Sequence, residues 1–331
     1  MTRALISDPQ MPAKAQAGRL DDIRACVACN QACIGHMLNA CSISCIQHPE
    51  TGRELIYGKR KPIEKQRKIL VVGGGPAGMK AAAVAAERGH QVTLFEAANQ
   101  LGGQVNLAHL LPGRAEFGGV TTNLAREVEA AGVDVRLNTS VDLDHIQRSA
   151  PDAVILATGG KAYEPTLDDS DDAHVVSAWQ VLEGKANVGA RVVIADWRCD
   201  WVGLGMAERL ARDGCQVRLA VNGMVAGQTI PQYARDSWLG DLHKFGVEII
   251  SYVRLFGADT EDAYFQHTLS GEPVILNGVD TVVTALGTHP VNDLEKELAN
   301  WPGEVHVIGD ALCPRTVEEA VLEGLKTASL I

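Results

Sequence analysis

Residues 68–96 read KILVVGGGPAGMKAAAVAAERGHQVTLFE, and this stretch decides the fold of the chain. The short apolar run Lys68–Val72 predicts a buried strand, the alanine-rich residues 76–88 predict a helix that stops at Gly89, and Gln91–Phe95 predicts a second strand. A strand, turn, helix and strand in this order form the opening unit of a doubly wound α/β sheet.

Three glycines stand between the predicted strand and the predicted helix, in the pattern G-x-G-x-x-G. One glycine makes the tight turn, one lets the backbone reach a pyrophosphate, and one allows the helix to pack closely on the strand. The helix N-terminus adds unpaired N–H groups and the positive end of its dipole. A carboxylate closing the second strand can accept ribose hydroxyls of an adenosine. The pattern predicts binding of an adenine dinucleotide or ADP, in preference to an empty glycine turn, at Gly73, Gly75, Pro76, Ala77, Gly78 and Glu96.

Three later segments extend the predicted nucleotide site. The loop LGGQ at residues 101–104 can bring backbone close to a flavin, and two further strands end in Ala157-Thr158-Gly159 and Gly309-Asp310. Strand ends at the carboxyl edge of a doubly wound sheet face the ligand crevice. Asp310 is a candidate partner for a ribityl hydroxyl. The further predicted contacts are Gly103, Gln104, Thr158, Gly159, Gly309 and Asp310.

A second α/β unit begins with a predicted strand at residues 191–195, but it lacks a glycine turn. The strand is followed by DWRCDWVGLGMAE, and its first glycine pair begins eight residues after the strand ends. Glu208 occupies the third fingerprint position, where its charge is expected to repel a pyrophosphate. We therefore expect nicotinamide binding to be lost, leaving a structural unit that serves as a lid or docking surface.

Five of the eight cysteines fall within residues 26–45, and four of them have the spacing C-x2-C-x3-C-x11-C. Four thiolates suit a [4Fe–4S] cluster or a structural zinc ion. Zinc ribbons usually contain two C-x2-C pairs, so a single pair followed by x3 and x11 favours the cluster. The predicted ligands are Cys26, Cys29, Cys33 and Cys45. Cys41 falls outside the pattern and is expected to be a spare thiol.

Composition excludes several classes of function. The net charge is -11 with no basic stripe, which argues against nucleic-acid binding. The sequence has no apolar run of membrane-spanning length and no signal peptide. Eight cysteines without secretory features indicate a reducing compartment, and we expect a cytoplasmic protein.

The expected fold class is α/β: a short Cys-rich iron–sulfur segment, then a doubly wound FAD/NAD(P)-type domain with a second, inserted Rossmann-like domain. The late strand into Gly309-Asp310 and the closing helix return the chain to the first unit. The predicted parts are a docking arm at 1–23, an iron–sulfur segment at 24–62, an FAD/ADP-binding domain at 63–160 plus 288–331, and a degenerate NAD(P)-like domain at 161–287.

Taken together, these motifs resemble the C-terminal half of the trimethylamine dehydrogenase / 2,4-dienoyl-CoA reductase family of flavoproteins. The resemblance rests on RALISDP, GRLDDIRACVACNQAC, the x11 spacing to Cys45 with Pro49 after it, GGGPAG, LGGQ, ATGG and GDALCPRTVEEAVLEG. It covers essentially the whole chain. It implies that the four cysteines ligate [4Fe–4S], with Cys26 nearest the FMN.

The resemblance also implies a partner. Family members begin with an FMN-binding TIM barrel, of which only the last helix is expected here, so we expect a separate barrel subunit that carries the substrate chemistry. Arg3 corresponds to an arginine close to the FMN phosphate and is expected to complete the partner's flavin site. The glycine turn holds FAD in the reductases and ADP in the amine dehydrogenase. The LGGQ loop favours FAD, with ADP as the alternative.

Three hypotheses of function follow. The first is an electron-transfer subunit that takes electrons from FMN, where the partner oxidises an N-methylated amine, through the cluster to an acceptor such as an electron-transferring flavoprotein. The second is an NAD(P)H-dependent reductase module that feeds electrons through FAD and the cluster in the opposite direction. The third is a non-catalytic, ADP-binding structural subunit.

Overall fold

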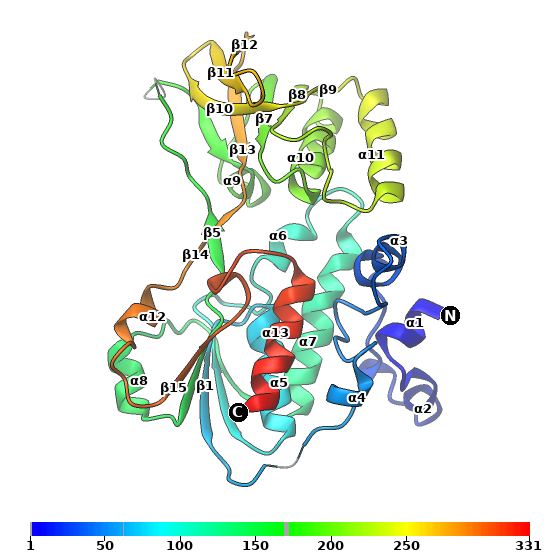
Figure 1. The fold of residues 1–331 in the computed structure, drawn as a ribbon, viewed down its shortest axis with the longest axis vertical. Coiled ribbons are helices and arrows are strands. Elements are labelled where there is room, and N and C mark those ends of the chain that lie inside the picture. Colours follow the sequence, from blue (N-terminus) through cyan, green and yellow to red (C-terminus); the bar gives the residue numbers. More distant parts are fainter. Residues whose placement is uncertain (1, 62, 169–171) are drawn as a thin grey trace. The chain divides into compact units, whose positions relative to one another are not determined.

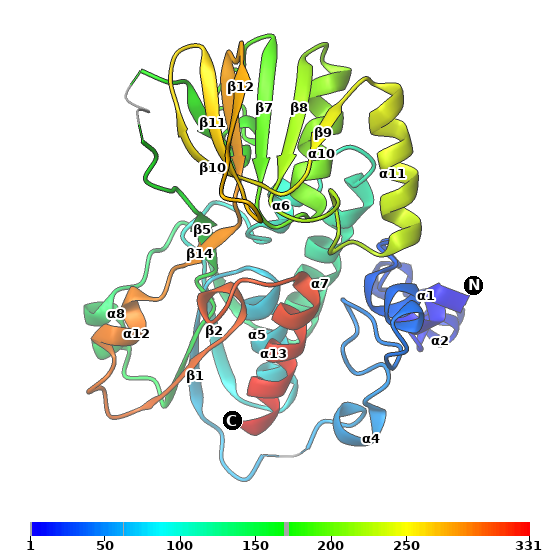
Figure 2. The ribbon, with the colours of Figure 1, turned by 45° about the horizontal axis from the view of Figure 1, so that its top comes forward.

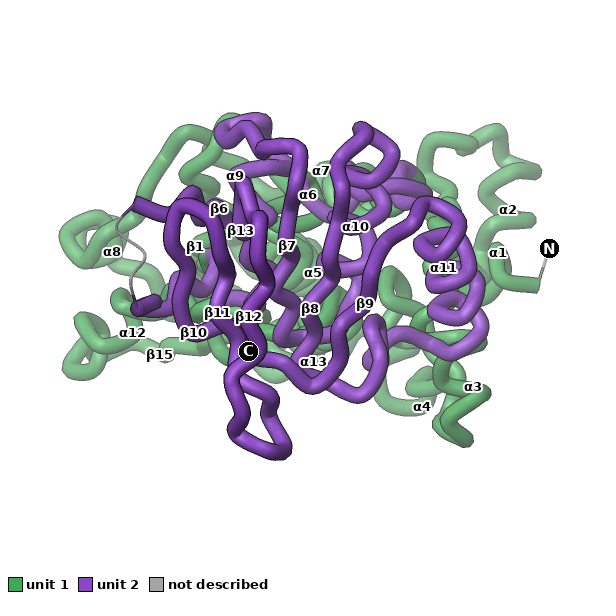
Figure 3. The backbone as a smooth tube through the Cα atoms, turned by 90° about the horizontal axis from the view of Figure 1, so that it is seen from above, with its two compact units in different colours: residues 1–106, 116–161, 289–331 green, residues 107–115, 162–288 purple. Residues whose placement is uncertain are grey.

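The computed structural model describes residues 2–61, 63–168 and 172–331. The chain divides into two compact units (Figure 3). Unit 1 comprises residues 1–106, 116–161 and 289–331, and unit 2 comprises residues 107–115 and 162–288. Each unit contains a five-stranded parallel sheet, which confirms the predicted α/β fold class.

The sheet of unit 1 places the nucleotide turn at its carboxyl edge. Its strands are β1 (Lys68–Val72), β2 (Gln91–Phe95), β3 (Asp134–Arg136), β4 (Ala153–Leu156) and β15 (Glu304–Val307). They lie in the order β15-β4-β1-β2-β3. Figure 1 labels β1 and β15 of this sheet. Val72 pairs with Phe95 on one side and with Leu156 on the other. The three central strands therefore end side by side, where loops that follow them can meet.

Helices cover both faces of this sheet. One face carries α5 (Pro76–Glu87), α7 (Gly119–Ala130) and α13 (Val317–Leu330), with α5 packed against the other two (Figure 2). The fit of α13 on α5 is close, because a Cβ atom on Gly324 would lie 2.5 Å from the carbonyl oxygen of Ala77. On the other face, Ile146 of α8 (Leu143–Ser149) and Leu298, just after α12 (Asp293–Glu297), complete an apolar core with Leu70 and Val72.

The first sixty residues form short helical segments joined by loops. These are α1 (Thr2–Ser7), α2 (Met11–Gln16), η1 (Leu20–Asp22), the π-helical turn η2 (Gln31–Gly35), α3 (His36–Leu38) and α4 (Glu54–Tyr57). Between residues 2 and 61 the chain makes no strand. Buried apolar side chains are few there, with Val27, Ala32 and Ile46 the examples. Apolar packing alone therefore gives this Cys-rich segment little order.

Unit 2 combines two sheets. The parallel sheet has the order β6-β13-β7-β8-β9, and an antiparallel sheet has the order β10-β11-β12. Phe265 and Val253 of the antiparallel sheet pack with Val193 of the parallel one. The strands are β6 (Val175–Ser177), β7 (Arg191–Asp196), β8 (Gln216–Val221), β9 (Glu248–Ile250), β10 (Val253–Ala258), β11 (Asp262–His267), β12 (Pro273–Asn277) and β13 (Thr281–Ala285).

The helices of unit 2 and the remaining short elements complete the chain. Unit 2 has α9 (Ala178–Leu182), α10 (Trp201–Arg212) and α11 (Gln232–Lys244). The remaining elements are α6 (Val105–Ala108), η3 (Ala115–Gly118), η4 (Gly309–Ala311) and the paired strands β5 (Gly160–Ala162) and β14 (Thr288–Pro290). In the part of the chain that the structure describes, every helix is too short or too polar to cross a membrane.

Candidate functional site

The glycine turn of unit 1 leaves no room for side chains where strand and helix meet. Gly73 has a φ of 108°, and a Cβ atom there would lie 2.2 Å from the carbonyl oxygen of Ala157. A Cβ atom on Gly78 would lie 1.9 Å from the carbonyl oxygen of Gly73. By contrast, the Cβ position of Gly75 points into open space. Gly75 is the N-cap of α5, with Pro76 and Ala77 following in the first turn, so the open space lies at a helix N-terminus.

Glu96 and the LGGQ loop close around this turn. Glu96 accepts hydrogen bonds from the Gly74 N–H at 2.7 Å and the Ala98 N–H at 2.8 Å. The Gly102 N–H donates to the Gly74 carbonyl oxygen at 2.9 Å. Gly103 has a φ of 52°, and its Cβ position lies 3.3 Å from the Gly75 Cα. The carboxylate at the end of β2 and the loop after it therefore both border the glycine turn.

The two other strand ends reach the same place. Ala157, at the end of β4, abuts Gly73, and a Cβ atom on Gly309 would lie 2.9 Å from the Cβ of Ala77. The Gln104 Nε2 donates to Asp310 Oδ2 at 2.8 Å, which joins two predicted contacts 206 residues apart. The structure thus brings together the glycine turn, Glu96, the LGGQ loop and Gly309-Asp310.

Thr158 and Gly159 turn the chain away from β4 beside this edge. The Thr158 hydroxyl donates to the Val291 carbonyl oxygen, and the Gly159 carbonyl oxygen accepts from the Val291 N–H at 2.9 Å. Sequence reasoning missed Glu323 of α13, which accepts from the Gly309 N–H at 2.8 Å and pairs with Arg315. No local signal marks it in the sequence, because Glu323 is one of three glutamates on α13.

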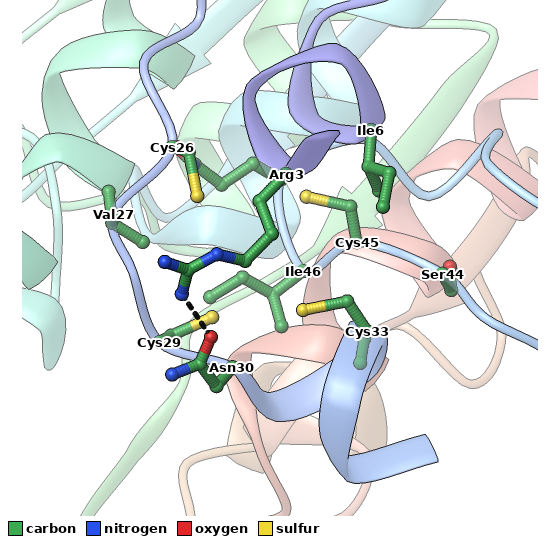
Figure 4. Close-up of a pocket in the computed structure, with 12 residues that line it drawn as sticks. Arg3, Ile6, Cys26, Val27, Cys29, Asn30, Cys33, Ser44, Cys45 and Ile46 are labelled. Carbon is green, nitrogen blue, oxygen red and sulfur yellow. Dashed lines mark hydrogen bonds between the residues drawn. The ribbon is translucent and has the colours of Figure 1, made fainter. Parts of the chain in front are cut away.

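The four predicted cysteine ligands line a single hollow in unit 1 (Figure 4). Cys26 and Cys29 come from an irregular segment, Cys33 from η2 and Cys45 from the loop before Ile46. The residues that line the hollow include no carboxylate and no histidine. Cys41 does not line it and is exposed. A donor set of four thiols fits an iron–sulfur cluster or zinc, which both take thiolate ligands.

Arg3 lines the same hollow. Its side chain extends from α1 over the space between the cysteines, and it donates a hydrogen bond to the Asn30 side chain (Figure 4). Asn30 follows Cys29 directly and has a φ of 57°. The structure therefore places Arg3 against the cysteines, at a point where its guanidinium is exposed.

Burial favours the neutral form of two of the thiols, those of Cys29 and Cys45. Burial raises the pKa of Cys29 to about 12, and neighbouring thiolate charges on Cys45, Cys33 and Cys26 raise it further. Burial also raises the pKa of Cys45, although hydrogen-bond donors and Arg24 oppose the shift. Four adjacent thiolates therefore need a compensating positive centre. Within the described ranges, no three His, Cys, Asp or Glu side chains approach closely enough to hold a single metal ion, so the four cysteines suit a cluster or zinc by donor type and by their shared hollow rather than by close approach of their sulfurs.

A buried ion network joins the Cys-rich segment to α5, the helix that follows the glycine turn. Lys80 of α5 is 1% exposed and donates to Glu127 Oε2 of α7 at 2.6 Å. Arg24, two residues before Cys26, donates through Nε to Glu127 Oε1 at 2.7 Å. Although burial opposes ionisation, the Lys80 and Arg24 charges keep the pKa of Glu127 below its usual value. The Glu127 carboxylate therefore anchors both α5 and the start of the cysteine segment.

In unit 2, two aspartate side chains bond to the backbone N–H groups of the turn between β7 and α10. Asp196, at the end of β7, accepts from the Arg198 N–H at 3.0 Å and the Cys199 N–H at 2.8 Å. Asp200 caps α10 by accepting from the Val202 N–H at 2.9 Å. The capped helix begins at Trp201, before the predicted glycine pair.

Glu208 lies elsewhere than the sequence suggested. It is buried on α10, where it accepts from Trp238 Nε1 of α11 at 2.6 Å and pairs with Arg212. The close-packing position beside β7 belongs to Gly203, because a Cβ atom there would lie 2.0 Å from Asp196 Oδ2. The expected repulsion of a pyrophosphate by Glu208 therefore has no basis in the geometry, and Asp196 and Asp200 are the carboxylates at the turn.

Comparison with known proteins adds the following. Residues 67–310 match the family described as pyridine nucleotide-disulphide oxidoreductase. The chain is 41% identical to an N,N-dimethylglycine/sarcosine dehydrogenase of Chromohalobacter salexigens, over 71% of this chain and 36% of the relative. It is 33% identical to an NADH oxidase of Thermoanaerobacter brockii, over 98% of this chain and 50% of the relative.

A solved structure gives a similar result. A 2-naphthoyl-CoA reductase in complex with 2-naphthoyl-CoA is 30% identical and has a TM-score of 0.90, over 99% of this chain and 50% of that chain. The chain spans half or less of the length of the three relatives named here.

Proposed function

This chain belongs to the pyridine nucleotide-disulphide oxidoreductase family, and we propose that it is the electron-transfer part of an iron–sulfur flavoprotein dehydrogenase or demethylase. The observation that carries the proposal is the meeting of four thiols at one hollow, in the same compact unit as a glycine-turn nucleotide site. Oxidoreductases use such pairs of sites to hold two redox groups at a fixed spacing.

Each site has residues that suit its group. Cys26, Cys29, Cys33 and Cys45 would each ligate one iron of a [4Fe–4S] cluster. The open backbone at Gly75 and the α5 N-terminus would hold the pyrophosphate, and Glu96 the adenosine ribose. Bound together, a cluster and FAD supply one-electron relay and storage of an electron pair.

The residues beyond the glycine turn favour FAD over ADP. Gly103 brings the LGGQ backbone against Gly75, and Gln104 orients the Asp310 carboxylate by donating to it. A carboxylate held in this way can accept a ribityl hydroxyl, a group that ADP does not have. Thr158 and Gly159 shape the strand end next to it. ADP would leave Gln104 and Asp310 without a role in binding.

We propose an FMN-binding TIM barrel as the electron donor and an N-methylated amine as its substrate. The similarity to a protein named N,N-dimethylglycine/sarcosine dehydrogenase supports this class of substrate. Arg3 would reach the FMN phosphate from the rim of the cysteine hollow, because its charged end is exposed there. An electron-transferring flavoprotein is the proposed acceptor.

The test is anaerobic reconstitution of the full chain with iron and sulfide, followed by assay of iron, sulfide and extracted nucleotide. We expect about four irons per chain and FAD in the extract. Reduction with dithionite should give the electron paramagnetic resonance signal of a reduced [4Fe–4S] cluster. Zinc in place of iron, or ADP in place of FAD, would refute the corresponding part of the proposal.

The similarity to a protein named NADH oxidase favours a second candidate, an NAD(P)H-dependent reductase module. Stopped-flow mixing of the loaded chain with NADH or NADPH separates the two. In the first function the flavin stays oxidised. Rapid flavin bleaching at micromolar NAD(P)H would establish the second.

A further inference from the structure

The helix α7 presents one face to the Cys-rich segment. Gly119, Asn123 and Glu127 are four residues apart, so they lie on one face of the helix. A Cβ atom on Gly119 would lie 2.9 Å from Val27 Cγ1, and Glu127 accepts from Arg24 Nε at 2.7 Å. The chain around the first cysteine ligand therefore runs along α7, in the direction opposite to the helix.

Between these two contacts, Asn123 closes a triangle of hydrogen bonds. Its Nδ2 donates to the Ala25 carbonyl oxygen at 3.1 Å and to Gln47 Oε1 at 2.6 Å. Gln47 Nε2 donates to the same Ala25 carbonyl oxygen at 3.0 Å. Gln47 is 1% exposed, and an unpaired amide in the interior is costly. The three groups therefore hold one another in a single arrangement.

The triangle joins the first and the last of the four predicted cysteine ligands. Ala25 directly precedes Cys26. Gln47 lies two residues after Cys45 and lines the cysteine hollow. Asn123 belongs to neither stretch, since it comes from α7. A side chain outside the Cys-rich segment therefore links the two ends of the ligand set.

A backbone hydrogen bond joins the stretches that hold Cys33 and Cys45. The Ser44 N–H donates to the Ala32 carbonyl oxygen at 2.8 Å, and each of these residues directly precedes a ligand. That bond lies within the Cys-rich segment, whereas Asn123 acts from α7. A substitution of Asn123 can thus loosen the link to the first cysteine and leave the backbone link in place.

We propose that Asn123 is a positioning residue that sets the placement of Cys26 relative to Cys45 for a bound cluster. The inference rests on the proposed function, because it needs a cluster at the four cysteines. Partners outside the ligand set orient the ligands and affect how tightly a metal centre is held. With the triangle intact, the two stretches are placed before the cluster is loaded, so binding has less of the chain to order.

The experiment measures the loss of iron to excess EDTA from the full chain reconstituted with iron and sulfide. Asn123→Ala should lose iron about tenfold faster than the wild-type chain, because removing a partner of a ligand weakens metal binding by this order. The electron paramagnetic resonance spectrum of its reduced cluster should also broaden, since the ligands are no longer held in one arrangement. The proposal needs both changes, and the absence of either one overturns it.

Thr122→Ala is the matched control, because Thr122 is the exposed neighbour of Asn123 on the same helix. Its iron loss and its spectrum should equal those of the wild-type chain. Faster iron loss of the same size in Thr122→Ala would overturn the proposal, since it would trace the effect to α7 as a whole. If Asn123→Ala does not fold, Asn123→Asp takes its place, because it keeps the size of the side chain and removes both donated hydrogens.

A double variant tests whether the triangle acts as a unit. Gln47→Ala opens the same triangle from its other side, so combining it with Asn123→Ala should speed iron loss by less than the product of the two single effects. Effects that multiply in full would show two separate contacts and refute the proposal. A wild-type chain that loads no iron would overturn the proposed function and this inference with it. A loaded wild-type chain with an unchanged Asn123→Ala would overturn the inference alone.

Discussion

The strand–helix turns of the two units have the same topology, but their backbone N–H groups bond to different partners. In unit 1, Gly75 caps α5 with no side chain, and open space lies beside it. In unit 2, Asp200 caps α10, and Asp196 takes two further N–H groups of the turn. A helix N-terminus attracts anions only while its N–H groups are available. The same topology therefore offers an anion site in one unit and two carboxylates in the other.

The residues with positive φ in the two turns also differ, since one has no side chain and the other a buried one. Gly73 has a φ of 108° and no side chain, so the backbone there can lie close to a ligand. Cys199 has a φ of 48° and a side chain that is 1% exposed, so its turn is packed from within. We expect nucleotide to bind at the first turn and to be excluded from the second.

The largest predicted effect concerns the ion network that anchors the first helix. Glu127→Gln removes the carboxylate that pairs with both Lys80 and Arg24, and breaking a buried pair costs about 3–5 kcal/mol. Urea unfolding should show this loss. Glu129→Gln, on an exposed pair with Arg126 in the same helix, should change stability by less than about 0.5 kcal/mol. Equal effects in the two variants would show that the network is not the anchor.

Close packing at the first turn should give the next largest effect. In Gly78→Ala, the new methyl group meets the Gly73 carbonyl oxygen. We expect the free energy of unfolding to fall by about 3 kcal/mol and nucleotide binding to be lost. Gly75→Ala meets no atom and should fold normally while binding nucleotide less tightly. Thermal unfolding and chromatography of the extracted nucleotide measure both. Normal nucleotide content in Gly78→Ala would contradict the assignment of the turn.

A third prediction tests the carboxylate inside the second turn. Burial raises the pKa of Asp196 to about 8, and the Asp200 charge adds to the rise. Between about pH 4 and pH 8 the folded chain retains a proton that the unfolded chain releases, so unfolding becomes easier as pH rises. The slope is at most about 1.4 kcal/mol per pH unit.

Asp196→Asn cannot titrate and should remove this decline. Unfolding in denaturant at pH 5, 6, 7 and 8 gives the comparison, and the free energy of unfolding of the wild-type chain should fall relative to that of the variant as pH rises. Parallel curves for the two proteins would mean that Asp196 is already ionised in the folded state.

The smallest expected effect is at the cap of α10. Asp200→Ala frees the Val202 N–H and should cost about 1 kcal/mol. It should also lower the repulsion that an incoming phosphate meets. Titration with ADP measures this change in repulsion. If the affinity of the variant for ADP does not rise, Asp200 is not the group that excludes phosphate from the turn.

Local patterns made much of this structure predictable. The glycine turn follows from backbone sterics within a few residues, and the α/β fold class follows from the alternation of strands and helices along the chain. Glu208 was misread because the glycines at 203 and 205 were taken as the turn. The cap at Asp200 in fact starts the helix at Trp201, and both glycines lie inside it.

The ion network had no local signal. Lys80 sits in an alanine-rich helix, where a lysine usually points to solvent, and its partner Glu127 is 47 residues away. Arg24 is 103 residues from the same glutamate. Only the packing of α5 against α7 brings the three charges together.

That shared glutamate also bears on how the protein matures. Residues 2–61 make no strand and bury few apolar side chains, whereas α5 and α7 fold on the parallel sheet. Arg24 can meet Glu127 only after those helices are in place. During biosynthesis the cysteine segment would therefore settle late, after the sheet and helices of unit 1 have folded.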